Sequence, residues 1–299
     1  MTNPRSVLLV GGPDAGKTNY LTRFWVALKA GEGCLRTRGL PADAEYLNSN
    51  EQALLGGAFA PHTPKSVHAR NVIPVGWSKD GSGELVVPDC AGEAWEEIHR
   101  TREWSEEWEA LLPSLAGCLV FVRAGSDEIV PALDWVNCAH LFGGPRQLSP
   151  TSAKARLPTQ VLLVDWVQCL TSAFASLPVP ACRLRIAMVV AAWDRVPKDQ
   201  QAGSPADYIA ANFRMLSDFI LSNGTVFDVT HFGVSSTGGD LETEPGYRDE
   251  YLRDPTAAGY VVHSLGGTVA RSSDLTLPVA WAMGVPVISA AAPGGGSRG

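Results

Sequence analysis

The chain has 299 residues, of which 45% are hydrophobic and 18% are charged, and its formal net charge is −7. This composition excludes an intrinsically disordered chain, because enough apolar side chains are present to bury a core. The acidic balance argues against binding of nucleic acid across a broad face, since such binding needs an excess of basic side chains. The 30 Gly and 21 Pro residues predict many loops.

Neither a signal peptide nor a membrane span is expected. No apolar signal-peptide core precedes the hydrophilic stretch that begins at Gly11, and prolines interrupt the long uncharged stretch that includes residues 277–293. The six cysteines form no CxxC pair and have no His at zinc-ligand spacing, which is typical of reduced, buried thiols. We therefore expect a cytoplasmic protein.

The first predicted strand, residues 5–10, runs directly into a glycine-rich loop at residues 11–18, GGPDAGKT. Apolar residues then recur at helical spacing over 21–28, until glycines end the helix. A strand, the pattern GxxxxGK[ST] and a helix in this order indicate a phosphate-binding (Walker A) loop. Its successive main-chain N–H groups can point at one phosphate. The alternative is a glycine-rich turn with a chance Lys-Thr pair.

Each residue type in this loop has a chemical reason. Gly11 and Gly16 allow a close approach that a Cβ would block. Lys17 is expected to bridge the terminal phosphates, and Thr18 to offer its hydroxyl to Mg²⁺. The predicted nucleotide-binding residues of this segment are Gly11, Asp14, Ala15, Gly16, Lys17, Thr18 and Asn19.

A carboxylate at the end of a predicted strand is found at Asp89. Residues 84–89 form an apolar run ending in this Asp, and residues 66–77 are predicted to pair with it as a hairpin. A nucleoside triphosphatase needs a carboxylate at the end of a neighbouring strand to hold Mg²⁺ through water. The alternative for Asp89 is a turn residue.

Three later runs predict buried strands. Residues 115–123 are followed by a strand that leads into Asp194, and then by residues 226–234. The last of these strands runs into a polar loop at 235–239. This loop resembles the last element of the P-loop GTPases, whose backbone groups touch the edge of the base, and the resemblance implies that role for Ser235 and Ser236. A plain loop is the alternative.

In this order, the segments resemble the Ras-like and translation-factor (TRAFAC) class of P-loop GTPases. Residues 89–93, DCAGE, match the class signature Asp-x-x-Gly, and Asp194 stands where the class has the Asp of Asn-Lys-x-Asp. Together with the LPVAW segment at 277–281, the pattern is similar to bacterial double-GTPases inferred in conflict systems. The resemblance implies an α/β P-loop NTPase fold, a doubly wound, mostly parallel sheet flanked by helices, with long loop insertions.

The resemblance also implies roles at the γ-phosphate. Asp89 takes the magnesium role, the Gly92 N–H senses the γ-phosphate, and Glu93 occupies the position of the water-orienting Gln. A carboxylate there repels the γ-phosphate unless it is compensated, so a solvated acid at a helix start is the alternative. Thr63 is chosen over Thr37 as the loop Thr that closes over Mg²⁺. The predicted catalytic residues are Lys17, Thr63, Gly92 and Glu93, and the predicted metal ligands are Thr18, Thr63 and Asp89.

At the base, Asp194 is implied to accept hydrogen bonds from N1–H and the exocyclic amine of guanine. Ala191 and Ala192 stand where the class has Asn and Lys, which removes the aliphatic stem that packs on the base. Trp193 or Arg195 could supply another flat contact. A helix cap or turn is the alternative role of Asp194.

We expect one domain over 1–285, with insertions near 30–64, 126–158 and 241–271 and a flexible tail at 286–299. Helices are predicted over 160–170, 207–221 and 274–283. Residues 93–112, which combine seven Glu with three Trp, are predicted as an amphipathic helix with an acidic solvated face, or as a nucleotide-sensing surface for a partner.

The sequence therefore predicts a Mg²⁺-dependent GTPase that binds GTP and GDP and acts as a molecular switch, with a protein effector or activator at the switch surface. Two alternatives stay open: a nucleotide-binding pseudo-GTPase that docks partners, and a P-loop ATPase. No Arg is assigned as a transition-state finger, and Arg123 and a residue supplied by a partner are both allowed.

Overall fold

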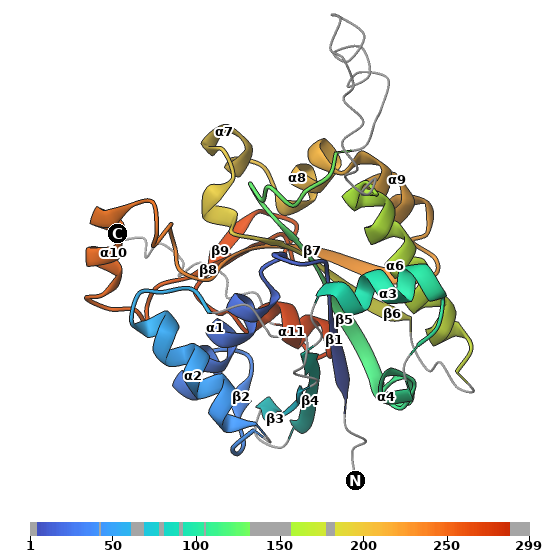
Figure 1. Ribbon diagram of the computed structural model, residues 1–299, viewed down its shortest axis with the longest axis horizontal. Helices are drawn as coiled ribbons and strands as arrows, with labels where there is room; N and C mark the ends of the chain where they lie inside the picture. Colours follow the sequence, from blue (N-terminus) through green and yellow to red (C-terminus); the bar gives the residue numbers. More distant parts are fainter. Residues whose placement is uncertain are drawn as a thin grey trace, which may run out of the picture.

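The central sheet has six strands in the order β1-β5-β6-β7-β8-β9 (Figure 1). The computed structural model describes residues 5–41, 43–60, 69–77, 81–89, 92–104, 106–131, 157–177 and 183–287. The strands β1, β5, β6 and β7 are parallel to one another, β8 pairs antiparallel with β7, and β9 pairs antiparallel with β8. Their bounds are β1 (Ser6–Val10), β5 (Leu115–Arg123), β6 (Leu184–Ala191), β7 (Phe227–Ser235), β8 (Tyr260–His263) and β9 (Ala270–Ser272).

A second, antiparallel sheet has the order β2-β3-β4, and β4 runs beside β1. Its strands are β2 (Arg36–Thr37), β3 (Ala69–Trp77) and β4 (Gly81–Asp89). β3 and β4 pair without interruption from Trp77↔Gly81 to Ala69↔Asp89. The predicted hairpin is therefore confirmed, and Asp89 is the last residue of its second strand.

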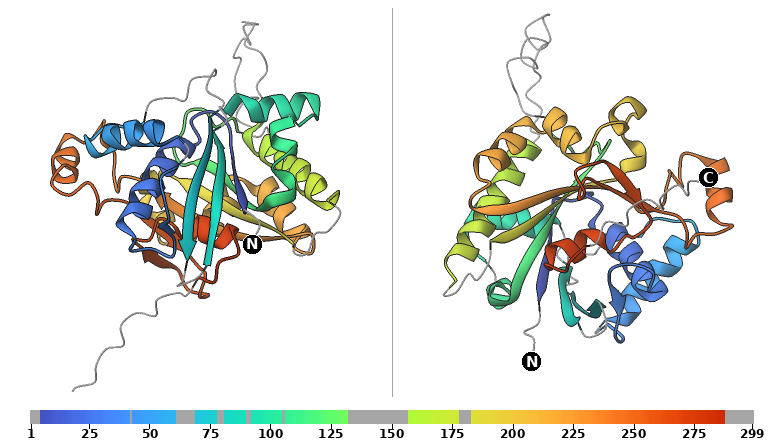
Figure 2. Two further views of the ribbon diagram at one scale, coloured as in Figure 1. Left: turned by 90° about the horizontal axis from the view of Figure 1, so that it is seen from below. Right: turned by 180° about the vertical axis from the view of Figure 1, so that it is seen from behind.

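Helices cover both faces of the central sheet (Figure 2). One face carries α1 (Lys17–Ala30), α2 (Ala44–Leu55) and α11 (Leu277–Ala282). The other carries α3 (Gly92–Thr101), α6 (Thr159–Ala175), α8 (Pro205–Asn212) and α9 (Arg214–Ser222). Because side chains alternate along a strand, Val7 and Leu9 of β1 pack in the first layer and Leu8 and Val10 in the second. The predicted α/β class is confirmed.

The prediction of one helix over 207–221 is wrong in one respect. The chain forms two helices, α8 and α9, because Phe213 leaves the helical region (φ −135°, ψ 56°) and its side chain is buried. A capping box between Ser204 and Asp207 starts α8. The helical spacing of apolar residues continues through the break, so periodicity alone does not reveal it.

Residues 93–112, which were predicted as one amphipathic helix, form several shorter elements instead. They form α3, then α4 (Glu106–Glu109) and the start of a 3-10 turn (Leu112–Ser114), because Arg102 adopts a left-handed conformation (φ 63°). Trp95 and Trp108 are buried with ring centroids 4.5 Å apart, and Trp104 packs on both. The described Glu side chains of this segment are exposed. The indole cluster, rather than one continuous helix, fixes this segment to the core.

The predicted insertions contain regular structure. Residues 30–64 include β2 and α2, and residues 241–271 include α10 (Pro245–Tyr251), β8 and β9. No strand was predicted in 241–271, yet β8 and β9 extend the central sheet beyond β7. Most of the predicted insertion at 126–158 and nearly all of the tail lie outside the described residues. No helix in the described part of the chain is long and apolar enough to cross a bilayer.

We expect His231 on β7 to make the stability of the fold depend on pH. Burial lowers the pKa of His231 to about 4, although the nearby Asp207 carboxylate acts to raise it. The unfolded chain takes up this proton near pH 6.5, whereas folded His231 stays neutral down to about pH 4, so stability is lost as pH falls between these values. The full effect, reached near pH 4, is about 3 kcal/mol of unfolding free energy.

Urea unfolding at pH 7.5 and pH 5 would measure this loss, and His231→Gln should reduce it. A smaller slope should remain, because burial also lowers the pKa of His263. An identical pH dependence in His231→Gln and in the unmodified chain would contradict the assignment.

Candidate functional site

The predicted phosphate and base residues meet at one edge of the central sheet. The loop after β1 and the segments after β5, β6 and β7 all leave the carboxyl ends of parallel strands. In open α/β sheets this edge is where ligands bind. One narrow cleft there is lined by residues from all four segments and from the end of α2: Gly16, Asn19, Phe59, Arg123, Ala191, Ala192, Asp194, Arg195, Ser236, Thr237 and Asp240.

The glycine-rich loop passes directly over the end of β6. Gly16 has φ +89°, and a Cβ on it would lie 2.8 Å from the Ala191 Cβ. A Cβ on Gly11 would lie 3.1 Å from the Phe121 carbonyl oxygen. Both glycines are therefore favoured by the close approach of the loop to neighbouring strands, whereas the predicted close approach of a phosphate to them stays a prediction. Helix α1 begins at once, since the Tyr20 N–H donates to the Gly16 carbonyl at 3.0 Å.

Lys17 lies over this loop. Its ammonium group donates to the carbonyl oxygens of Gly11 at 2.6 Å and Gly12 at 2.8 Å. Such bonds place the cation at the mouth of the ring of main-chain N–H groups, where a phosphate would be held. Thr18 follows on the first turn of α1, and its carbonyl accepts from the Thr22 hydroxyl at 2.8 Å.

An ion pair fixes the acidic residue of the loop. Asp14 has a left-handed backbone (φ 54°), and its carboxylate pairs with the Arg123 guanidinium from the end of β5. The Ser126 hydroxyl donates to the other carboxylate oxygen at 2.9 Å. Sequence reasoning weighed Arg123 only as a finger and missed this pairing. The contact compensates a negative charge in a loop shaped for an anion.

The predicted base residues are linked to each other. The Ser235 hydroxyl donates to Asp194 Oδ1 at 2.5 Å and accepts from the Gly238 N–H at 2.8 Å. Ser235 is fully buried, so it acts on the cleft by orienting Asp194, whereas Ser236 lines the cleft itself. Asn19 also lines the cleft, and its side-chain oxygen accepts from the Ala60 N–H at 2.9 Å.

Trp193 does not supply the flat contact that was considered for it. The left-handed turn at Ala192 (φ 53°) sends its ring into the core, where it is buried beside Gly233 and Tyr208. Arg195 is exposed and lines the cleft instead. Phe59 lines it as well, and sequence reasoning missed it, because an aromatic residue in a loop carries no pattern of its own.

The γ-phosphate end is described only in part. Asp89 is the last residue of β4 and Gly92 the first of α3, but the side chains of Asp89 and Glu93 lie outside the described residues, as does all of Thr63. Thr37 pairs with Val75, which pairs with Gly83, six residues before Asp89 along β4. At about 3.3 Å per residue this separation is about 20 Å. Thr37 therefore cannot share a metal ion with Asp89.

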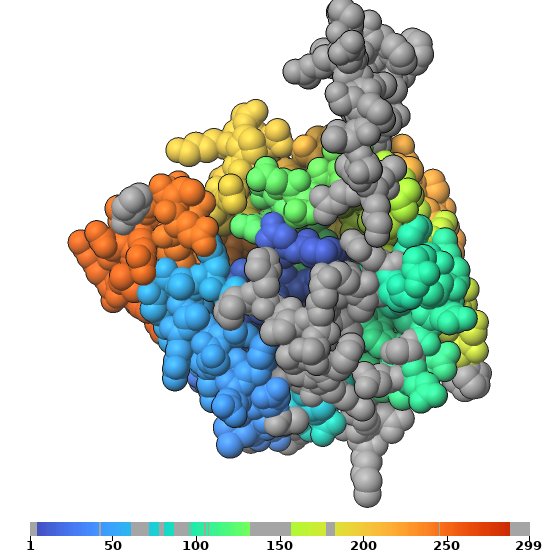
Figure 3. Space-filling view, viewed as in Figure 1, coloured from blue at the N-terminus to red at the C-terminus, as the bar shows by residue number. Residues whose placement is uncertain are grey.

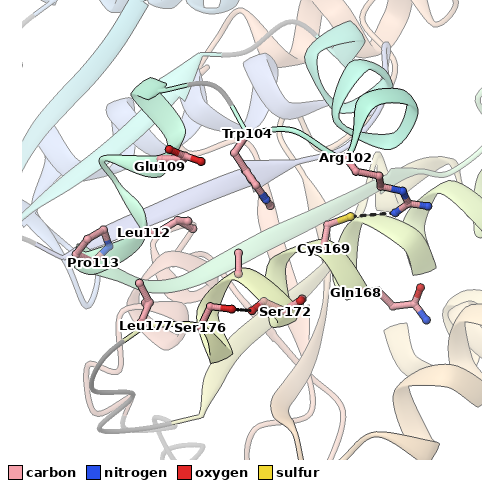
Figure 4. Close-up of a pocket in the computed structure, with 11 residues that line it drawn as sticks. Arg102, Trp104, Glu109, Leu112, Pro113, Gln168, Cys169, Ser172, Ser176 and Leu177 are labelled. Carbon is pink, nitrogen blue, oxygen red and sulfur yellow. Dashed lines mark hydrogen bonds between the residues drawn. The ribbon is translucent and has the colours of Figure 1, made fainter.

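Helix α3 is held on α6 by a buried carboxylate. Asp165 of α6 accepts from His99 Nδ1 at 2.7 Å and pairs with Arg102 Nη1 at 2.5 Å. The Trp166 indole N–H donates to the Trp95 carbonyl at 2.8 Å. Below this junction, a groove of about 610 Å³ opens between α6 and the segment from Arg102 to Pro113 (Figure 4). Trp104 and Leu112 face Leu177 across it, beside the segment predicted as a partner surface.

Comparisons with known proteins identify the family of the chain. The family model described as Double-GTPase 1 matches residues 8–282, which is most of the chain. No curated protein matches it. Among solved structures, the chain is similar to the signal recognition particle receptor SRb-GTP/SRX complex from Chaetomium thermophilum. The identity is 15%, the coverage is 84% of this chain and 98% of that chain, and the TM-score is 0.38.

The family match spans every element of the cleft, from β1 through the phosphate loop, β6 and Asp194 to α11. On the family match, the chain belongs to the Double-GTPase 1 family and is a nucleotide-binding protein of GTPase type.

Proposed function

We propose that the protein is a Mg²⁺-dependent GTPase that uses GTP binding and hydrolysis as a conformational switch. The observation that carries the proposal is the meeting of the phosphate loop and the Asp194–Ser235 pair at one edge of the sheet. Phosphates on residues 14–18 and a base at Asp194 would then belong to one ligand. The site is built from four separate strand ends, which a chance glycine-rich turn would not require.

Guanine selectivity is proposed to come from Asp194. A carboxylate held at Oδ1 by Ser235 keeps lone pairs for the N1–H and the exocyclic amine of guanine, a pair of donors that adenine does not offer. In place of the Lys stem missing at Ala192, Arg195 and Phe59 are the side chains available to pack on the base. Arg195 can stack its planar guanidinium on a ring.

Magnesium is proposed to bind at Thr18 and, through water, at Asp89, with Thr63 closing over it. Hydroxyl and carboxylate oxygens are the hard donors that Mg²⁺ prefers, so the residues fit the ion. When bound, Mg²⁺ would neutralise charge on the β- and γ-phosphates. Lys17 would bridge these phosphates, the Gly92 N–H would sense the γ-phosphate, and Glu93 would orient water. An effector or activating partner at the surface after Gly92 remains part of the proposal.

A panel of nucleotides in a thermal-shift assay tests base choice. With Mg²⁺, GTP and GDP should raise the melting temperature through binding to the folded state, and ATP should not. Asp194→Asn keeps the side-chain shape but exchanges a carboxylate oxygen for an amide donor, so the shift with GTP should fall to that with ATP. Equal stabilisation of the unmodified chain by GTP and ATP would contradict the guanine assignment and favour the ATPase.

Single-turnover hydrolysis separates an enzyme from a pseudo-GTPase. Phosphate release from GTP should be measurable and should be lost in Lys17→Ala, because the terminal phosphates lose their cation. Lys29→Ala is a matched control, since Lys29 lies on the same helix but pairs with Glu51 at the surface. Release from the unmodified chain no faster than from Lys17→Ala would leave only the docking module.

The Asp14–Arg123 pair is expected to tune affinity for the nucleotide. In Arg123→Ala the Asp14 charge faces the phosphates uncompensated, and partial exposure of both groups limits the loss to about tenfold in Kd for GTP. Asp14→Asn, which tolerates the left-handed backbone, should bind at least as tightly as the unmodified chain. The double variant should regain most of the loss. If it binds as weakly as Arg123→Ala alone, charge compensation is not the role of Arg123.

A further inference from the structure

A buried cation lies behind the proposed base cleft. Arg23 of α1 is 1% exposed, and no ion pair of Arg23 is found in the described part of the chain. Its guanidinium donates to the Ser236 carbonyl at 2.5 Å, to the Pro255 carbonyl at 2.7 Å and to the Tyr251 hydroxyl at 3.1 Å. Burying a guanidinium without a carboxylate is costly, so these three acceptors hold it in one place.

The partners of Arg23 belong to segments that are far apart in sequence. Ser236 lines the base cleft, and Tyr251 and Pro255 lie at the end of α10 and just after it. The Tyr251 hydroxyl, which accepts from Arg23, also donates to the Leu54 carbonyl in the last turn of α2 at 2.9 Å. Its single donor and its acceptor are thus both used. One guanidinium and one phenol connect α1, α2, α10 and the Ser236 loop.

These contacts reach both walls of the cleft. One wall is the loop after β7, where Ser236 is bound by Arg23 and the Thr237 carbonyl accepts from the Tyr247 hydroxyl at 2.6 Å. The other wall begins where α2 ends and carries Phe59. Tyr251 anchors the start of that wall at Leu54. Helix α10 lies along the end of α2, and their surfaces are continuous in Figure 3.

We propose that Arg23 and Tyr251 are positioning residues that hold the two walls of the base cleft at the spacing required by guanine. The proposal rests on the proposed function of that cleft. It gives α10 and its flanking segment, residues 245–255, the role of a brace for nucleotide selectivity. Loosening the brace should let Ser236 and Phe59 move apart, so that a bound guanine nucleotide leaves faster and is distinguished less well from adenine.

Tyr251→Phe is the sharpest variant. It removes the bonds to Arg23 and Leu54 but keeps the ring, whose centroid lies 5.9 Å from the Arg23 Cζ. Tyr20→Phe is the matched control. It also removes a buried hydrogen bond from a tyrosine hydroxyl to a carbonyl, in this case from Tyr20 of α1 to Leu275 at 3.1 Å, and this bond lies away from the cleft. Tyr247→Phe tests the neighbouring contact to Thr237. Arg23→Ala is avoided, since the cavity and the orphaned carbonyls could prevent folding.

The readouts are the release rate of a fluorescent GDP analogue, the ratio of Kd values for ATP and GTP, and the melting temperature without nucleotide. Tyr251→Phe, which loses both hydrogen bonds of the brace, should release GDP about tenfold faster and should lower the Kd ratio. Tyr20→Phe should lower the melting temperature by a similar amount and leave release and selectivity unchanged.

The outcomes distinguish this proposal from the proposed function. If the unmodified chain prefers guanine and Tyr251→Phe behaves like Tyr20→Phe, the brace is overturned and the guanine site stands. If the unmodified chain shows no preference between GTP and ATP, the guanine site fails and the brace fails with it.

Discussion

The close contact between Gly16 and Ala191 is the constraint on which the site depends. It seats the phosphate loop on the carboxyl end of β6, so that main-chain N–H groups and Asp194 face one cleft. Ala191 stands where the resemblance to the GTPase class places an Asn, and a Cβ on Gly16 would clash with its methyl group. The packing between loop and strand therefore requires a glycine at position 16.

Positive side chains lie at the proposed phosphate site although the net charge of the chain is negative. A chain with a net charge of −7 repels a polyanion at long range, so cations must be concentrated where phosphates bind. Lys17 lies at the mouth of the loop, and Arg123 cancels the charge of Asp14. Arg23 has a different purpose, because carbonyl groups surround it away from solvent. Its hydrogen bonds hold α1 to the Ser236 loop and to the segment that follows α10.

Much of the fold could be predicted from the sequence because its strands are buried apolar runs with clear ends. The loop at 11–18, the hairpin ending at Asp89 and the strands before Arg123, Asp194 and Ser235 were found in this way. The break at Phe213 was not, because apolar spacing continues through it. Strands β8 and β9 are too short and too close to glycines to form a pattern.

The side-chain pairs of the site were harder to predict than its backbone. Asp14 and Arg123 are 109 residues apart, and Arg23 and Ser236 are 213 apart, so no local pattern links them. The choice between Trp193 and Arg195 for the cleft depends on one left-handed residue, Ala192, whose conformation a lone Ala does not announce. Residue type and spacing identify which groups bear the chemistry, whereas the contacts that orient them appear only in three dimensions.

The anchoring of α3 limits how the proposed switch could work. The helix begins at Gly92, and Trp95 is already fully buried against Trp108 and Trp166. Its last turn and the residue that follows are fixed to Asp165. A displacement of Gly92 would therefore have to be absorbed within the first turn, or else it would withdraw an indole from the core and break the contacts of the buried Asp165 carboxylate with His99 and Arg102. Since the second course costs far more, movement is confined to the residues before Trp95 unless a partner supplies the energy.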